Sequence, residues 1–236
     1  MNYHTTDPEF MERFEHFAFD EAANEKEAAL EPVIRYTAIL SALIGCGGTD
    51  AYREMLPTAL EAGLSPVAVK EIVYQAADYL GMGRMWAFLG ITNEVFTEKG
   101  IPLPLAGQAA TTMEDRLEKG AAVQAEIFGE SMRDAWKAGP IHRFLAANCF
   151  GDYYTRGGLS LAEREMITFC FLMAQGGCEP QLTAHVKGNR NLGNDRVFLT
   201  KVVLQCLPYI GYPRSLCAPV SYTHLRAPET AANLVC

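Results

Sequence analysis

The chain of 236 residues repeats itself at an offset of 130 residues, and this repeat constrains its fold more than any other feature. Two or three matches at one offset could arise by chance, whereas seven in order and without a gap indicate a duplicated unit. The matched pairs are Gly63 and Gly193, Val67 and Val197, Val73 and Val203, Gln75 and Gln205, Tyr79 and Tyr209, Gly81 and Gly211, and Arg84 and Arg214.

The repeated pattern predicts two consecutive helices in each copy. Gly63 suits the C-cap of one helix, where a left-handed residue is favoured. Ser65 before Pro66 suits the N-cap and first turn of the next helix. Val67 begins the apolar face of that helix, and Gly81 ends it. In the second copy Gly193, Val197 and Gly211 suit the same roles, and Asn194 before Asp195 suits the N-cap.

Further helices flank this core of the repeat. Residues 7–25 form an amphipathic pattern, and residues 32–44 are almost wholly apolar, which predicts a buried helix that 161–174 mirrors in the second copy. Two capping boxes, Thr111-x-x-Glu114 and Ser160-x-x-Glu163, predict helix starts near residues 112 and 161. Trp86 is expected in the core, as is Trp136.

No segment alternates apolar and polar residues over a useful length, so we expect no strands. The fold class is therefore all-α, with two tandem helical units that form an intramolecular pseudo-dimer. Residues 1–100 form the first unit and 113–218 the second. Residues 101–112, which contain two prolines and no charge, form the linker.

The composition narrows the functional classes. A formal net charge of −8 without a Lys/Arg cluster argues against binding to nucleic acid or to an anionic membrane. The most apolar stretch, residues 166–174, is shorter than the roughly 20 residues that span a bilayer, and the N-terminus does not read as a signal peptide. The seven cysteines form no C-x-x-C pair and no metal-ligand spacing, which predicts reduced thiols in the cytoplasm. We expect a small-molecule substrate and neither a metal nor a cofactor.

The second copy carries the segments GLSLAEREMITF, GGCEPQLTAHVKGNRNLGN and LPYIGYPRSL in this order. This arrangement resembles the carboxymuconolactone decarboxylase / alkylhydroperoxidase D-like family, over roughly residues 8–218. In that family an Arg-Glu helix, a helix that bears a histidine, and a Tyr-x-Gly-x-Pro turn recur. The resemblance implies an all-α fold in which two such units surround a pocket, and it implies assembly into homo-oligomers.

The resemblance also implies a site. In the alkylhydroperoxidase D branch a C-x-x-C-x3-H element begins a helix, and a glutamate lies on the preceding helix. The matching residues here are Cys178, Gln181, His185 and Glu165, so the second cysteine of the motif is replaced by Gln181. Glu179 is the expected N-cap, which places Cys178 at the helix N-terminus, where the helix dipole favours a thiolate.

The other residues of this region carry weaker expectations. Glu165 is expected to orient His185, and both are expected to share a pocket with Gln181 or Cys178. Tyr209 and Arg214 recur in both copies, which favours a packing role, but Arg214 is also a candidate ligand for a substrate carboxylate. The remaining cysteines at 46, 149, 170, 206 and 217 are expected in the core. The first copy has Arg35 and Met55 in place of Glu165 and His185, so its site is expected to be degenerate.

Three functions remain open at this stage. The first is a thiol-dependent peroxidase that uses Cys178 with His185 and Glu165, and it requires a resolving thiol elsewhere because residue 181 is not cysteine. The second is a decarboxylase or lyase that acts on a small carboxylated lactone, with His185 as acid and base and with Arg214 or Lys187 as the carboxylate anchor. The third is a member without catalysis that binds a ligand or only assembles.

The C-terminal residues 219–236 are expected to lie outside the native fold. The repeat requires a helix over about 212–229, but Pro219 and Pro228 interrupt it, and each costs about 3 kcal/mol inside a helix. The segment SYTHLRAPETAANLVC also resembles translated sequencing-adapter read-through.

Overall fold

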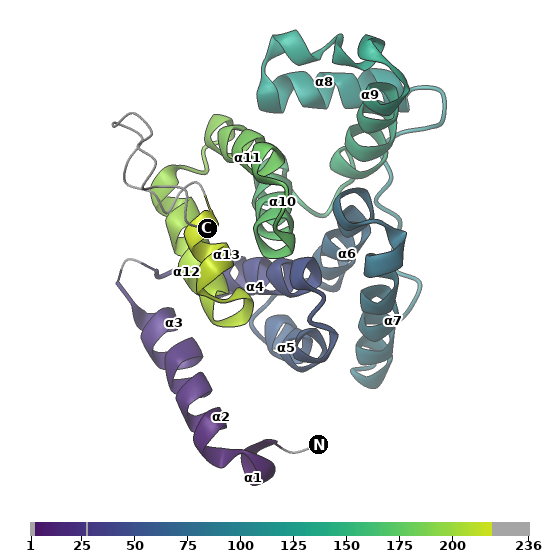
Figure 1. The fold of residues 1–236 in the computed structure, drawn as a ribbon. Coiled ribbons are helices and arrows are strands. Elements are labelled where there is room, and N and C mark those ends of the chain that lie inside the picture. Colours follow the sequence, from purple (N-terminus) through teal and green to yellow (C-terminus); the bar gives the residue numbers. More distant parts are fainter. Residues whose placement is uncertain (1–2, 27, 219–236) are drawn as a thin grey trace, which may run out of the picture.

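The computed structural model describes residues 3–26 and 28–218, and within these ranges every regular element is helical (Figure 1). The first unit comprises α1 (Tyr3–Thr6), α2 (Pro8–Glu15), the π-helix η1 (His16–Glu21), α3 (Ala22–Asn24), α4 (Pro32–Cys46), α5 (Thr49–Glu61), α6 (Pro66–Leu80) and α7 (Met82–Glu98). The second comprises α8 (Arg116–Phe128), the short 3-10 helices η2 (Glu130–Met132) and η3 (Ala135–Ala138), α9 (Pro140–Phe144), the π-helix η4 (Leu145–Tyr154), α10 (Leu161–Gln175), α11 (Glu179–Asn191), α12 (Arg196–Ile210) and α13 (Tyr212–Cys217).

The helix boundaries reproduce the repeat in the sequence. Helices α5 and α11 begin and end 130 residues apart, and so do α6 and α12. Each unit also has a π-helical stretch before its buried helix, η1 in the first and η4 in the second. The predicted all-α fold of two tandem units is therefore confirmed.

The helices of the two units pack against one another around a common centre. Helices α4 and α10 pack along each other in the middle of the molecule (Figure 1). Helix α6 of the first unit packs on α10 of the second, and α12 of the second unit packs on α4 of the first. The π-helices follow the same rule, since η4 contacts α6 and η1 contacts α12. Each unit therefore covers the other, as in a dimer whose subunits are joined in one chain.

Both central helices are buried, as their apolar sequences predict. Every residue from 36 to 45 and from 164 to 174 is buried. The helices approach closely at Gly45, where an added Cβ would lie 2.8 Å from the Ala174 Cβ. The expectation for Trp86 is wrong, because its residue is 63% exposed on the outer side of α7, whereas Met85 and Phe88 turn inward.

Side-chain caps begin three of these helices. The Ser65 hydroxyl accepts the Ala68 amide at 3.1 Å, and the Asp195 carboxylate accepts the Phe198 amide at 2.8 Å. Ser160 and Glu163 form the predicted capping box at the start of α10. These local signals therefore fix where α6, α10 and α12 begin.

The second predicted capping box is not formed. Helix α8 begins at Arg116, four residues after the predicted start. The Asp115 carboxylate accepts the Thr112 amide at 2.7 Å, and the Thr112 hydroxyl accepts the Glu114 amide at 3.3 Å. These bonds close a polar turn, so Thr111 and Glu114 lie before the helix rather than at its first turn.

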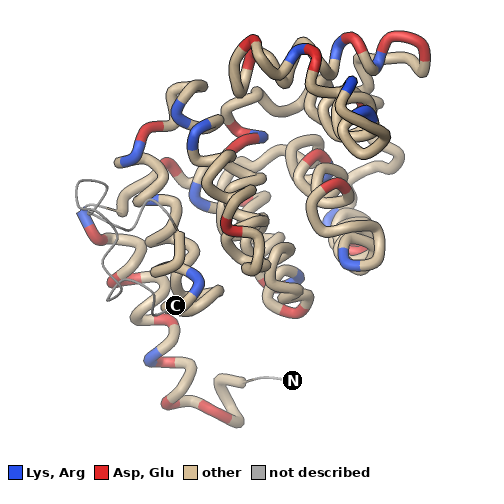
Figure 2. Tube along the Cα trace, turned by 45° about the horizontal axis from the view of Figure 1, so that its top comes forward, with Lys and Arg blue, Asp and Glu red and all other residues tan. Residues whose placement is uncertain are grey.

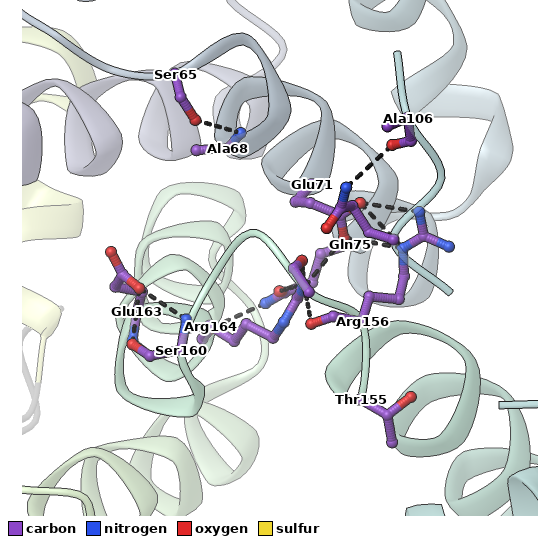
Figure 3. Close-up of polar contacts among 12 residues, drawn as sticks. Ser65, Ala68, Glu71, Gln75, Ala106, Thr155, Arg156, Ser160, Glu163 and Arg164 are labelled. Atoms are coloured by element: carbon purple, nitrogen blue, oxygen red, sulfur yellow. Dashed lines mark hydrogen bonds and ion pairs between the residues drawn. The ribbon is translucent and has the colours of Figure 1, made fainter. Parts of the chain in front are cut away.

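A buried ion network joins the units beside the central helices (Figure 3). Arg164 donates to Glu71 at 3.0 Å and to the Gln75 side chain at 3.1 Å. Arg156 donates to both carboxylate oxygens of Glu71, at 2.9 Å for each closest pair. Gln75 in turn donates to the Arg164 carbonyl and to Thr168, at 2.8 and 2.9 Å. This network fixes α6 of the first unit against α10 of the second.

Acidic and basic positions are interspersed along the chain (Figure 2). Within residues 3–26 and 28–218, each helix is too short or too polar to span a bilayer. Residues 219–236, for which the sequence predicts a tail outside the native fold, lie outside the described residues.

Candidate functional site

The expected carboxylate–imidazole pair is present between two helices of the second unit. Glu165 lies on α10 and His185 on α11, and His185 Nδ1 lies 2.9 Å from Glu165 Oε2 and 3.1 Å from Oε1. Glu165 is fully buried, and His185 is 8% exposed. With Nδ1–H donated to the carboxylate, Nε2 is the ring nitrogen that can exchange a proton with a bound molecule.

The backbone around this pair holds both helices in place. The Asn189 side-chain amide donates to the Glu165 carbonyl at 2.9 Å and to the His185 carbonyl at 2.8 Å. Gly188 faces the carboxylate, and an added Cβ there would lie 2.5 Å from Glu165 Oε2. Only glycine lets α11 come this close to α10 at that point.

Two tyrosines extend the pair into a larger hydrogen-bonded network. The Tyr154 hydroxyl donates to Glu165 Oε1 at 2.9 Å and lies 2.6 Å from the Thr168 hydroxyl. It also lies 2.8 Å from the hydroxyl of Tyr79, which comes from α6 of the first unit. The rings of Tyr79 and Phe128 meet the His185 ring edge to face, with centroids 5.5 and 5.4 Å away. The imidazole is therefore fixed on all these sides, and its partners come from both units.

A pocket of about 620 Å³ opens beside His185. Its walls come from α6 of the first unit and from α8, η4, α10 and α11 of the second. Cys178, Gln181 and Lys187 line it together with His185. The structure thus brings four of the residues singled out in the sequence to one cavity, with Glu165 directly behind His185.

Cys178 differs from expectation in its surroundings. It is itself the N-cap of α11, and Glu179, the expected N-cap, is the first helical residue. Its thiol donates to the Leu172 carbonyl at 3.4 Å and accepts from the Gln175 amide at 3.5 Å. Burial raises the pKa of the Cys178 thiol, and the charge of Glu179 adds to this, while the bond from Gln175 opposes it. The expected lowering of the thiol pKa is therefore not found.

The wall contributed by the first unit carries a buried carboxyl group. Asp78 lines the pocket, and its Oδ2 has no hydrogen-bond partner among the described residues. Burial, together with the nearby charge of Asp152, raises the pKa of Asp78 to about 7, although a hydrogen bond with the Cys149 thiol opposes the rise. Gln124 lines the same pocket, and its Oε1 is likewise buried without a partner in the part of the chain described. The pocket therefore offers unsatisfied polar atoms opposite an acid–base pair.

Tyr209 and Arg214 lie elsewhere. Arg214 donates to the Ala174 carbonyl and lines a separate cavity of about 120 Å³, on the other side of Cys178. Tyr209 packs against the apolar core and meets the Phe14 ring edge to face at 6.1 Å. Neither residue lines the pocket beside His185.

The corresponding position in the first unit has different chemistry. Arg35 replaces Glu165 and donates to the Gln205 side chain at 2.7 Å. Met55 replaces His185 and belongs to the apolar core. The first unit therefore has an arginine and an apolar methionine where the second unit has its acid–base pair, as expected for a degenerate copy.

Sequence reasoning missed several residues of the pocket. Tyr79 recurs as Tyr209, so the repeat marked it without indicating its role. Tyr154 and Asp78 carried no signal, since neither belongs to a repeated or family motif. Cys149, expected in the core, is buried but also lines the pocket, and its thiol contacts the Tyr79 hydroxyl at 3.6 Å. Across the residues described, no three His, Cys, Asp or Glu side chains are grouped as metal ligands.

Comparison with known proteins agrees with this architecture. The sequence model of the carboxymuconolactone decarboxylase family matches residues 8–94 and 140–218, which together exceed half of the chain. A 4-carboxymuconolactone decarboxylase from Acinetobacter baylyi is 28% identical over 110 residues, which cover 43% of this chain and 80% of that relative. One family match falls in each of the two helical units, and the second begins at α9. The chain belongs to the carboxymuconolactone decarboxylase family.

Proposed function

We propose that this protein is a carboxy-lyase that removes CO2 from a small carboxylated lactone, with His185 as its acid and base. The observation that carries the proposal is the buried Glu165–His185 pair, whose second ring nitrogen is left for a molecule in the adjoining pocket. The similarity to a 4-carboxymuconolactone decarboxylase supports the choice of substrate class.

The proposed reaction needs only groups that the pocket supplies. The C–C bond to the carboxylate breaks, CO2 leaves, and the electron pair of that bond moves into a conjugated carbonyl to give an enolate. His185 then delivers a proton to carbon, and the enolate collapses back to the carbonyl. Positioned general acids of this kind contribute about 10²–10⁴-fold to a rate.

Lys187 is the proposed anchor for a second carboxylate or for the lactone. It lines the pocket, whereas Arg214, the alternative anchor, lines a different cavity. A lysine ammonium is a point charge on a flexible stem, so it suits a carboxylate near the mouth of the pocket. Gln181 lines the same wall and is a candidate hydrogen-bond partner for the substrate.

The peroxidase hypothesis is less well supported. A peroxidase needs a thiolate at neutral pH, and burial raises the pKa of Cys178 instead. Gln181 also removes the local disulfide partner. One observation favours this alternative, namely that a second thiol, Cys149, lines the same pocket and could act as a resolving cysteine.

The test is CO2 release from 4-carboxymuconolactone by the wild type and by three variants. We expect His185→Ala to lose activity by at least about 10²-fold with an unchanged helical circular dichroism spectrum, since it removes the proton donor. Glu165→Gln should lose activity to a smaller extent, and Cys178→Ser should retain it. Peroxide consumption that depends on Cys178, without CO2 release, would instead establish the peroxidase. Binding without either reaction would identify a non-catalytic member.

We also propose that the protein works in the cytoplasm as a homo-oligomer. The scattered cysteines, which form no C-x-x-C pair in the sequence, support a reducing compartment. Large apolar side chains at the surface, such as Trp86, Tyr212 and Leu216, support an association of copies. Light scattering coupled to size-exclusion chromatography would measure the assembly, and a monomer at micromolar concentration would contradict it.

A further inference from the structure

We propose that Asp78, on α6 of the first unit, is a catalytic residue of the second unit's site and donates a hydrogen bond from its protonated carboxyl group to the substrate oxygen that becomes negative as CO2 leaves. This inference rests on the proposed carboxy-lyase function. It adds a residue that the family motifs in the second copy do not include.

The first argument is the position of the carboxyl group. Asp78 and His185 line one pocket from different units, and the neighbour of Asp78, Tyr79, contacts the ring of His185. Asp78 Oδ2 is buried without a partner among the residues described, and Gln124 Oε1 is in the same state. Buried polar atoms are almost always paired, so the unpaired oxygens of two residues that line this pocket favour a polar partner at this wall.

The second argument is the protonation state. The groups that act on Asp78 are Asp152, Cys149 and Tyr153, and Asp152 is itself paired with Arg116 at 2.8 Å. The titratable side chains that line the pocket with Asp78 are those of Tyr79, Cys149, Cys178, His185 and Lys187. No ion pair of Asp78 occurs within the described part of the chain. With its pKa raised to about 7, mainly by burial, the carboxyl group keeps a substantial protonated fraction at neutral pH.

The third argument is chemical. When the bond to CO2 breaks, its electron pair moves into the conjugated carbonyl, and the negative charge collects on that oxygen. A neutral carboxyl group donates a hydrogen bond to such an enolate oxygen and keeps its own proton. His185 protonates the carbon, so Asp78 and His185 divide the two tasks. No further reactant is needed.

The repeat explains why we expect one such site within the described residues. The residue 130 positions after Asp78 is Pro208, which has no donor or acceptor side chain. Thus α6 supplies a carboxyl group to the second unit, but α12 supplies none to the first. The missing carboxyl group and the missing His–Glu pair belong to the same half of the pseudo-dimer.

The experiment compares Asp78→Ala with Asp78→Asn over pH 5–9, using CO2 release from 4-carboxymuconolactone. We expect Asp78→Ala to lower kcat by about 10²–10³-fold, as loss of one oxyanion donor does. Asparagine keeps a donor and cannot ionise, so Asp78→Asn should retain activity within about tenfold and lack the fall in activity above pH 7 that we expect of the wild type. Asp50→Asn, at an exposed aspartate on α5 that does not line the pocket, is the control. Wild-type activity and an unchanged pH profile in both Asp78 variants would overturn the proposal.

A second readout does not depend on turnover. Carbon-13 NMR should show a carboxyl signal, absent in Asp78→Asn, that titrates near pH 7. Muconate, a conjugated dicarboxylate, should move that titration to higher pH, because its anionic oxygens favour the protonated form of Asp78. If the enzyme releases no CO2 but this shift occurs, the proposed reaction fails and the Asp78 contact stands. If CO2 is released but the signal neither titrates near 7 nor responds to muconate, the Asp78 inference alone fails.

Discussion

Replacement of Gly188 by alanine should disrupt the candidate site through a single methyl group. The new Cβ would lie 2.5 Å from Glu165 Oε2, 2.8 Å from Phe128 Cε1 and 2.9 Å from Ile127 Cγ2. None of these neighbours is the free end of a flexible chain, because Glu165 is held by His185 and Tyr154, and Ile127 is fully buried. Helix α11 must therefore move away from α10, or the carboxylate must leave its partners.

The two contributions to stability oppose each other. Overpacking a core costs about 1–3 kcal/mol, whereas alanine in place of glycine inside a helix gains roughly 0.5–1 kcal/mol. We therefore expect a net loss of about 0–2.5 kcal/mol, which corresponds to a fall in Tm of up to roughly 10 °C for a chain of this size. The rate of CO2 release should be affected more strongly than the free energy of unfolding, because the displaced Glu165 oxygen is the atom that orients His185.

Gly90→Ala is the matched control. Gly90 also lies inside a helix, α7, but no atom lies within 4 Å of an added Cβ. The same substitution there should raise Tm slightly and leave CO2 release unchanged. Thermal unfolding and activity measured in parallel decide the matter. Equal effects of the two substitutions, or a Gly188→Ala protein with wild-type Tm and activity, would refute the reasoning.

Two further predictions concern buried charges. Arg164→Met should destabilise the fold by about 3–5 kcal/mol in urea unfolding, because it leaves Glu71 buried with Arg156 as its remaining ion-pair partner. Arg133→Met, at an exposed pair, should change little, and equal effects would count against the buried network. Asp78 has a higher pKa when folded than when unfolded, so its contribution to stability is present below about pH 4 and is lost as the pH rises through about 7. The free energy of unfolding of Asp78→Asn should therefore rise relative to that of the wild type between pH 5 and 8. Parallel curves of this free energy against pH for the two proteins would contradict this.

The fold was accessible from the sequence because its determinants are local and occur twice. Ser65 and the Ser160–Glu163 capping box fix helix starts through bonds that span three residues. The 130-residue offset then predicts the helices of the second unit from those of the first. The prediction of a capping box at Thr111 was wrong because a capping box and a polar turn use the same residue types. Here the hydrogen bond to the Asp115 carboxylate favours the turn.

The site was only partly accessible. Glu165 and His185 carry a family motif, and their contact follows from neighbouring helices of one unit. Tyr79 and Asp78 reach the pocket from the other unit, over a separation that no local pattern encodes. Likewise, the helix dipole suggested a reactive thiol at Cys178, but burial has the larger effect there, and burial depends on tertiary packing.

These cross-unit contacts predict that the degenerate half cannot be repaired by restoring its acid–base pair. Arg35→Glu with Met55→His would recreate the pair at the 130-residue offset. However, Asn24 stands in place of Tyr154, which donates to the carboxylate, and Ala38 in place of Thr168, which contacts the Tyr154 hydroxyl. Pro208 stands in place of Asp78. The new carboxylate would also face the Gln205 side-chain oxygen that Arg35 now binds. In a His185→Ala background we therefore expect the double variant to release no CO2, and recovered activity would show that a His–Glu pair alone makes the site.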